Sequence, residues 1–271
     1  MEFLYRLKRK ALNVYRIIKY AYIKEHNIKG PKVWYGDNKK QCYKVYNSKN
    51  KDKPTIFFVH GRGWSQGSPS LYGGVGKFFF KHGYTSSLVG YRLVPKFTYP
   101  SQIEDAFIAL KHYLDNNHDV NNIILAGYSA GGEIASRLAF DTKRQQQYNI
   151  DTNLIKGFIS ISGVLDFEKC NSKYSKKLLK NYLLNKSIKT ENPINLLSEY
   201  SILPTLCIHG DKDSLISVEN SISFIDKLRL FNKNADLLVI KDAEHEHTID
   251  IVRGNGNKYS NYVFEFIENN S

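Results

Sequence analysis

The sequence predicts an α/β fold with a mostly parallel central sheet, helices on both faces and a small cap insertion. Two observations lead to this prediction. Between residues 55 and 240, short apolar runs typical of buried strands alternate with segments of helical periodicity. A polar stretch at about residues 166–200 interrupts the alternation between two predicted core strands. Since such alternation forms parallel sheets through right-handed crossovers, we expect one sheet with one insertion.

The N-terminal segment, residues 1–30, is distinct from the predicted domain at 31–271. From Met1 to His26, apolar residues recur at near-helical spacing with Lys and Arg between them, which predicts a basic amphipathic helix. No apolar run has the length of a bilayer span, and no secretory signal pattern is present. The helix either packs over its own domain as a cap or makes peripheral contact with an anionic membrane surface.

The first elements of the domain are an edge hairpin and a strand. Lys32 to Val45 holds aromatic and β-branched residues on both sides of a Gly-Asp-Asn turn, which predicts the hairpin. This hairpin and the N-terminal helix are the two candidate surfaces for a homodimer. Thr55 to Val59 is a short apolar run that ends in a glycine-rich segment, so it predicts a buried strand.

The remaining elements follow in the same alternation. The helical spacing of Ile103, Phe107 and Leu110 is typical of a helix with one buried face. Strands are expected at Thr85 to Val89, Ile123 to Ala126, Gly157 to Ser162, Pro204 to His209 and Leu237 to Ile240, and helical segments at Lys77 to His82, Ile103 to Asn116, Gly131 to Phe140 and Val218 to Leu228.

The composition limits the function classes. The net charge of +13 would favour polyanionic partners, but the basic residues are scattered rather than clustered, so we expect no nucleic-acid binding. The three cysteines are odd in number and far apart, without a Cys-x-x-Cys pair. The cysteine pattern predicts a reduced, cytoplasmic protein without a zinc or redox motif. No cofactor and no metal is expected for the chemistry that the motifs below predict.

A candidate nucleophile lies in the G-x-S-x-G pattern at residues 127–131. A predicted strand precedes Ser129 and a predicted helix follows it, which is the strand–turn–helix context of a nucleophile elbow. Gly127 and Gly131 supply the small residues that this tight turn requires. The N–H of Ala130, at the helix N-terminus, then points at a developing oxyanion.

Several further motifs resemble those of one enzyme family. They are H-G-R-G-W at residues 60–64, Y-R-L-V-P at residues 91–95, Y-P-S-Q-I-E-D at residues 99–105 and G-Y-S-A-G-G at residues 127–132. In this order they resemble the signatures of hormone-sensitive-lipase-like and acetyl-esterase-like α/β hydrolases, which include kynurenine-formamidase-related enzymes. The resemblance implies the α/β-hydrolase fold and an oxyanion hole formed by the N–H groups of Arg62, Gly63 and Ala130.

Two residues depart from this family pattern. Arg62 stands where the family usually has glycine, and its side chain either favours acidic substrates or points to solvent. Tyr128 stands where many relatives carry Asp, and we expect it to affect packing rather than chemistry.

The catalytic acid and base follow in the order Ser, acid, His. H-G-D-K-D-S-L-I at residues 209–216 resembles the turn that carries the family's acid, which by spacing is Asp213, with Asp211 as the competitor. The loop after Leu237 to Ile240 resembles the one that delivers the base, His245, although His247 stays open as an alternative.

These residues predict a serine carboxylesterase. The resemblance implies a small-molecule substrate with a short acyl chain, such as an acetylated small molecule or sugar. Two alternatives stay open: an aryl formamidase with the same triad, and a non-catalytic ligand-binding protein on the same scaffold.

Overall fold

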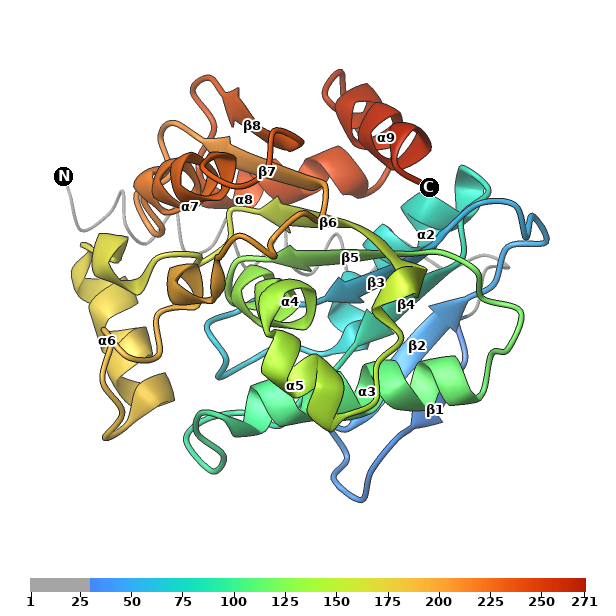
Figure 1. The fold of residues 1–271 in the computed structure, drawn as a ribbon, viewed down its shortest axis with the longest axis horizontal. Coiled ribbons are helices and arrows are strands. Elements are labelled where there is room, and N and C mark those ends of the chain that lie inside the picture. The colour runs from blue at the N-terminus through green and yellow to red at the C-terminus, as the bar shows by residue number, and fades with distance from the viewer. Residues whose placement is uncertain (1–29) are drawn as a thin grey trace, which may run out of the picture.

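An eight-stranded sheet forms the centre of the molecule (Figure 1). The computed structural model describes residues 30–271, and the predicted N-terminal helix lies outside them. The strand order is β1-β2-β4-β3-β5-β6-β7-β8. Neighbouring strands from β4 to β8 are parallel, and β1 and β2 are antiparallel at one edge. The predicted α/β-hydrolase fold and its edge hairpin are therefore confirmed.

The bounds of the elements agree with most of the predicted ranges. The strands are β1 (Lys32–Trp34), β2 (Cys42–Tyr46), β3 (Thr55–Val59), β4 (Ser86–Val89), β5 (Ile123–Tyr128), β6 (Ile155–Ile161), β7 (Thr205–Gly210) and β8 (Ala235–Ile240). The α-helices are α2 (Gly73–Lys81), α3 (Ser101–Asp115), α4 (Ala130–Phe140), α5 (Thr142–Gln147), α6 (Lys173–Leu183), α7 (Glu219–Arg229), α8 (His245–Thr248) and α9 (Ser260–Asn269).

Two apolar clusters cover the two faces of the sheet. Successive residues of a strand point to opposite faces, so Phe57 joins one cluster and Phe58 the other. The first cluster includes residues of α3, α4 and α7, and the second includes residues of α2 and α9. Each face of the sheet is thereby buried, as a parallel sheet requires.

Helix α9 was not among the predicted elements, although its sequence carries a signal. Val263, Phe266 and Ile267 are buried at helical spacing against the second face of the sheet. The short helix α5 was also missed, because its residues 142–147 are polar and bury only Gln145. In α5, Asp141 supplies the N-cap by accepting a hydrogen bond from the Arg144 N–H.

The segment between β6 and β7 contains α6 and lies at one end of the sheet (Figure 1). Ser172 caps α6 by accepting a hydrogen bond from the Ser175 N–H at 3.0 Å. Leu179, Tyr182 and Leu183 are buried, while the opposite side of the helix is exposed. We call residues 162–204 the β6–β7 insertion.

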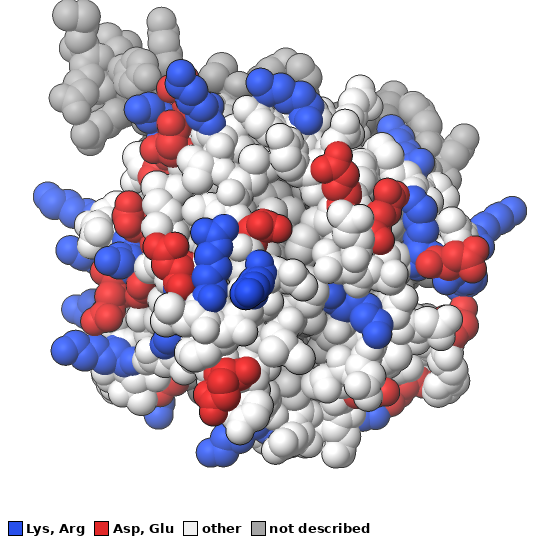
Figure 2. All heavy atoms as spheres, turned by 45° about the horizontal axis from the view of Figure 1, so that its top comes forward, with Lys and Arg blue, Asp and Glu red and all other residues white. Residues whose placement is uncertain are grey.

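The surface carries charges of both signs. On the face drawn in Figure 2, basic and acidic side chains are interspersed. Among residues 30–271, no helix is long and apolar enough to cross a membrane.

Helix α4 lies so close to β3 that only glycine fits at the contact. A Cβ atom on Gly131 would lie 2.1 Å from the Val59 carbonyl oxygen, which belongs to the rigid sheet. We expect Gly131→Ala to lower the free energy of unfolding by about 3 kcal/mol or more. Gly254→Ala is the matched control, because Gly254 has a φ of 68° but nothing within 4 Å of an added Cβ.

Urea denaturation of the two variants separates packing from backbone strain. Gly254→Ala should cost about 1 kcal/mol, the strain of alanine at positive φ. Equal losses in the two variants would contradict the close approach of α4 to β3.

Candidate active site

Ser129 occupies a strained turn between β5 and α4. Its φ of 55° and ψ of −122° are rare for a residue with a side chain, and such strain is typical of functional sites. A Cβ on Gly127 would lie 2.1 Å from the Gly131 carbonyl oxygen, so glycine closes this turn. The Ser129 N–H donates to the Ile161 carbonyl at 2.9 Å, which ties the turn to β6.

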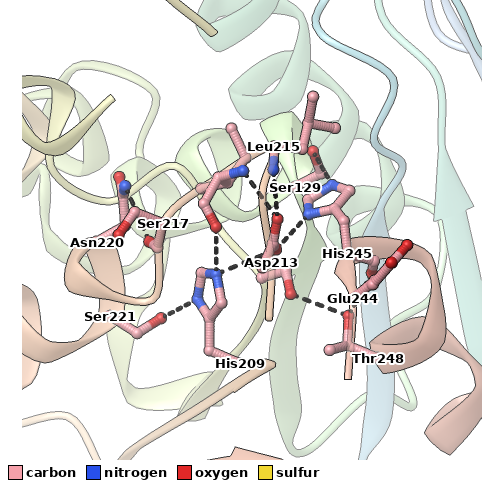
Figure 3. Close-up of polar contacts among 12 residues, drawn as sticks. Ser129, His209, Asp213, Leu215, Ser217, Asn220, Ser221, Glu244, His245 and Thr248 are labelled. Atoms are coloured by element: carbon pink, nitrogen blue, oxygen red, sulfur yellow. Dashed lines mark hydrogen bonds and ion pairs between the residues drawn. The ribbon is translucent and has the colours of Figure 1, made fainter. Parts of the chain in front are cut away.

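Asp213 follows β7, and its carboxylate receives hydrogen bonds on both oxygens. Oδ1 accepts from the N–H groups of Leu215 at 3.0 Å and Ile216 at 2.8 Å. Oδ2 lies 2.6 Å from His245 Nδ1 and 3.2 Å from His209 Nε2. Figure 3 shows this carboxylate between the two imidazole rings. Burial alone would raise the pKa of Asp213, but the bonds from His209 and His245 outweigh it and hold this pKa well below its usual range.

His209 holds Asp213 from the side opposite His245. Its Nε2 faces two acceptors, the Ile216 carbonyl at 2.9 Å and the Asp213 carboxylate, so this nitrogen carries the proton. Its Nδ1 lies 2.8 Å from Ser221 Oγ, from which it accepts a hydrogen bond in the neutral tautomer. His209 is fully buried and is thus a positioning residue for the carboxylate.

His245 connects Asp213 to Ser129. Its Nδ1 faces an ionised carboxylate, which only accepts, so Nδ1 carries the proton and Nε2 is left as an acceptor. Nε2 lies 2.9 Å from Ser129 Oγ. The His245 carbonyl accepts from the hydroxyl groups of Tyr128 at 3.2 Å and Thr248 at 2.8 Å, which fixes the residue at the start of α8. Tyr128 therefore supports the histidine loop, in addition to the packing role expected for it.

Asp211 and His247, the alternative acid and base, make other hydrogen bonds. Asp211 is exposed, and its N–H donates to the Ile240 carbonyl at 3.1 Å. His247 Nδ1 accepts a hydrogen bond from the Glu244 N–H at 3.1 Å and so completes the N-terminal cap of α8. The structure thus brings Asp213 and His245, rather than Asp211 and His247, to Ser129.

The loop after β3 approaches Ser129 with three consecutive residues at positive φ. These are Arg62 at 87°, Gly63 at 59° and Trp64 at 56°. Arg62, Gly63 and Ala130 line the same cavity as Ser129. Within the described part of the chain, the N–H groups of these three residues have no hydrogen-bond acceptor. Three donors are therefore available beside the serine hydroxyl.

His60 anchors the start of this loop. Its ring is fully buried and stacks on Tyr91, with 4.4 Å between the centroids. Its Nδ1 lies 2.9 Å from the Gly61 carbonyl, and the Tyr91 hydroxyl donates to the His60 carbonyl at 2.9 Å. Burial lowers the pKa of His60 to about 4, so the ring is neutral near pH 7.

A buried carboxylate, Glu133, ties three elements together behind the site. Its Oε2 accepts from Trp64 Nε1 at 3.2 Å and from the Tyr182 hydroxyl at 3.1 Å. Its Oε1 pairs with Arg137 Nε one helical turn along α4. The rings of Trp64 and Tyr182 stack with centroids 4.1 Å apart and an interplanar angle of 4°. Glu133 thus joins α4, the loop after β3 and α6.

Arg137 balances the charge of Glu133. Burial alone would lower the pKa of this guanidinium, but the adjacent carboxylate outweighs burial and raises it. Arg137 also donates to the Glu191 carbonyl and lies over the Tyr99 ring, 5.0 Å from its centroid. The ion pair therefore extends into the β6–β7 insertion.

The cavity at Ser129 has a volume of about 350 Å³. Part of the cavity wall is apolar. The apolar residues come mostly from the β6–β7 insertion and the turn after β7, and they include Val164, Leu178, Leu179, Leu215 and Ile216. Among residues 30–271, no group of three or more His, Cys, Asp or Glu side chains is arranged to hold a metal ion.

Comparison with known families agrees with this geometry. Residues 42–228 match the BD-FAE family. The chain belongs to the BD-FAE family. This membership and its esterase relatives confirm the predicted resemblance to hormone-sensitive-lipase-like α/β hydrolases. Esterase LipC of Mycobacterium tuberculosis is 28% identical over 227 residues, which cover 75% of this chain and 56% of LipC.

Two other similar proteins extend the comparison. The putative α/β hydrolase R526 of Acanthamoeba polyphaga mimivirus is 37% identical over 102 residues, 35% of this chain and 30% of that protein. The crystal structure of esterase B from Lactobacillus rhamnosis superposes with a TM-score of 0.77 at 17% identity, covering 99% of this chain and 96% of that one. At that identity the superposition shows the fold alone. The chain spans about half or less of the length of LipC and R526.

Two residues that support the site, His209 and Glu133, were not predicted from the sequence. His209 belongs to the H-G-x-x-D pattern that marked Asp213, so its position in the motif was a usable signal. Glu133 had no such signal, because its partners Trp64 and Tyr182 lie 69 and 49 residues away in the chain.

The buried Glu133–Arg137 ion pair should contribute measurably to the free energy of unfolding. Glu133→Gln leaves a buried guanidinium without a counter-charge, so it should lower the free energy of unfolding by about 3–5 kcal/mol. The double variant Glu133→Gln/Arg137→Met should lose less than the sum of the two single variants. The exposed pair Lys111–Asp115 has the same i,i+4 spacing and is the control. In urea denaturation, Asp115→Asn should lower the free energy of unfolding by about 0.5 kcal/mol or less. If the loss in the double variant equals the sum of the losses in Glu133→Gln and Arg137→Met, the pairing is contradicted.

The lowered pKa of His60 should make the stability of the protein depend on pH. Below its ordinary pKa of 6.5 the unfolded chain takes up a proton that the folded chain, with a pKa of about 4, does not. The stability from His60 is therefore complete above pH 6.5 and is lost as the pH falls toward 4. Between pH 7 and pH 5 this loss amounts to about 2 kcal/mol.

His60→Asn removes the titrating group while its amide reaches the place of Nδ1. Urea denaturation at pH 7 and pH 5 should show a smaller fall in the free energy of unfolding for His60→Asn than for the wild type. Equal falls would argue against a neutral, buried His60.

Proposed function

We propose that this protein is a serine carboxylesterase that acts through an acyl-enzyme on Ser129. The observation that carries the proposal is the continuous chain of hydrogen bonds from Ser129 Oγ to His245 Nε2 at 2.9 Å and from His245 Nδ1 to Asp213 at 2.6 Å. A serine, a neutral histidine and an ionised carboxylate in this order form the arrangement that activates a serine hydroxyl. The esterase names among its relatives support the same activity.

In the first half of the reaction, His245 Nε2 takes the Ser129 proton as Oγ attacks the ester carbonyl. Asp213 keeps the imidazole in the required tautomer and stabilises the imidazolium that forms. Collapse of the tetrahedral intermediate breaks the bond to the alcohol, which leaves with the proton from Nε2. Water then repeats the sequence on the acyl-enzyme, releases the acid and restores Ser129.

The negative charge on the carbonyl oxygen needs donors that are in place beforehand. We assign this role to the N–H groups of Arg62, Gly63 and Ala130, since each lines the cavity and has no acceptor within residues 30–271. The positive φ values at Arg62 and Gly63 support the assignment, because they turn successive peptide groups in a way that extended chain does not.

The cavity favours a small substrate. A volume of about 350 Å³ is at the lower end of the range for small-molecule sites. The β6–β7 insertion supplies Leu178 and Leu179 to its wall and acts in this proposal as the cap that was expected at about residues 166–200. Short acyl esters of a small molecule or sugar fit these limits.

Hydrolysis of p-nitrophenyl acetate, butyrate and octanoate tests the activity. Ser129→Ala, His245→Ala and Asp213→Asn should each lower kcat by about 1,000-fold or more, because each breaks the relay of the serine proton. Acetate and butyrate should be cleaved faster than octanoate.

Neighbouring residues of the same types provide the controls. Asp211→Asn should retain most of the activity, and His247→Gln should lose far less than His245→Ala. Equal rates in the wild type and Ser129→Ala would refute the esterase proposal and favour a formamidase or a ligand-binding protein.

A further inference from the structure

Several polar side chains in the wall of the cavity at Ser129 have no role in the proposed reaction. Arg62, Gln66, Tyr72 and Arg253 line the cavity, together with leucine residues of the β6–β7 insertion. Burial raises the pKa of Tyr72 to about 12, and the positive charges of Arg62 and Arg253 oppose that rise. Both guanidinium groups therefore act on the same region of the cavity.

These two arginines differ in their partners. Arg253 is paired with Asp250, its Nε lying 3.0 Å from the carboxylate, so its charge is balanced locally. Arg62 has one long contact, from Nη2 to Gln66 Oε1 at 3.4 Å. Within residues 30–271, no carboxylate lies within ion-pair distance of Arg62. Glu246 also lines the cavity, but it forms no ion pair with Arg62.

The backbone conformation of Arg62 is a second indication that its side chain is functional. Its φ of 87° is uncommon for a residue with a Cβ, and glycine adopts it freely. An arginine at such a position adds strain in a loop that glycine would form without it. Strain of this kind is expected where the side chain contributes to function.

We propose that Arg62 selects esters that carry a carboxylate, which its guanidinium binds while Ser129 attacks the ester carbonyl. This inference rests on the proposed esterase function and names its substrate class. The planar guanidinium matches a carboxylate with two parallel hydrogen bonds, and the half-buried position limits competition from water. The apolar wall then holds the uncharged half of the substrate.

Matched pairs of esters test this selectivity. The pair 4-acetoxybenzoate and methyl 4-acetoxybenzoate places the charge in the alcohol half, and p-nitrophenyl hydrogen adipate and p-nitrophenyl hexanoate place it in the acyl half. In the wild type, the charged member of at least one pair should have a kcat/KM about tenfold higher. The ratio within a pair cancels any effect on the oxyanion N–H groups.

Two variants assign the preference to Arg62. Arg62→Gln should bring the kcat/KM ratio of the charged to the uncharged ester close to one. Arg62→Lys should retain part of this ratio, because it keeps the positive charge but loses the planar group that makes two parallel hydrogen bonds. Lys143→Gln is the matched control, since it removes the same charge from an exposed site on α5. This control should keep the wild-type ratio.

The outcomes separate this proposal from the esterase proposal. Equal kcat/KM values for both members of both pairs, or a ratio that survives in Arg62→Gln, would overturn the selectivity while leaving the esterase intact. If no ester is hydrolysed, calorimetric binding of 4-acetamidobenzoate and its methyl ester decides instead. Tighter binding of the carboxylate by the wild type, but not by Arg62→Gln, supports the proposal, and equal binding by the wild type overturns it.

Discussion

The carboxylate of Glu133 is the interaction on which the geometry around Ser129 depends. It is fully buried, and its oxygens bind the side chains of Arg137, Trp64 and Tyr182. A buried carboxylate is stable only when its charge and its lone pairs are satisfied, so each partner must stay in place. Because the partners come from α4, the loop after β3 and α6, one charged group fixes three separate chain segments relative to Ser129.

Asp213 shows the same principle at the other end of the site. Four donors surround it, and two of them are backbone N–H groups of the turn that carries it. This turn therefore folds around the carboxylate, and His209 closes the side that His245 leaves open. The result is an imidazole whose tautomer is set by its surroundings before any substrate binds. Preorganisation of this kind spares the reaction the reorganisation of solvent.

The parts of the protein that could be predicted from the sequence are those marked by a motif or a periodic pattern within one short stretch of the chain. The strand, turn and helix around Ser129 lie within about twenty consecutive residues, and the motifs near Asp213 and His245 are equally short. Contacts between distant residues gave no such signal. Glu133 looks like an ordinary helix residue in the sequence, and only the fold shows that it faces Trp64. Helix α9 is different, because the spacing of Val263, Phe266 and Ile267 is a local periodic signal that the sequence does contain.

Glu133 and Arg62 use their charges in opposite ways at the loop after β3. Glu133 is neutralised by Arg137 behind the loop, so this pair contributes little net field to the cavity. Arg62 belongs to the loop itself and has no carboxylate partner within residues 30–271. One residue, Gly63, separates Arg62 from Trp64, whose indole N–H donates a hydrogen bond to Glu133. The buried pair thus holds the loop from which the Arg62 side chain extends into the cavity at Ser129.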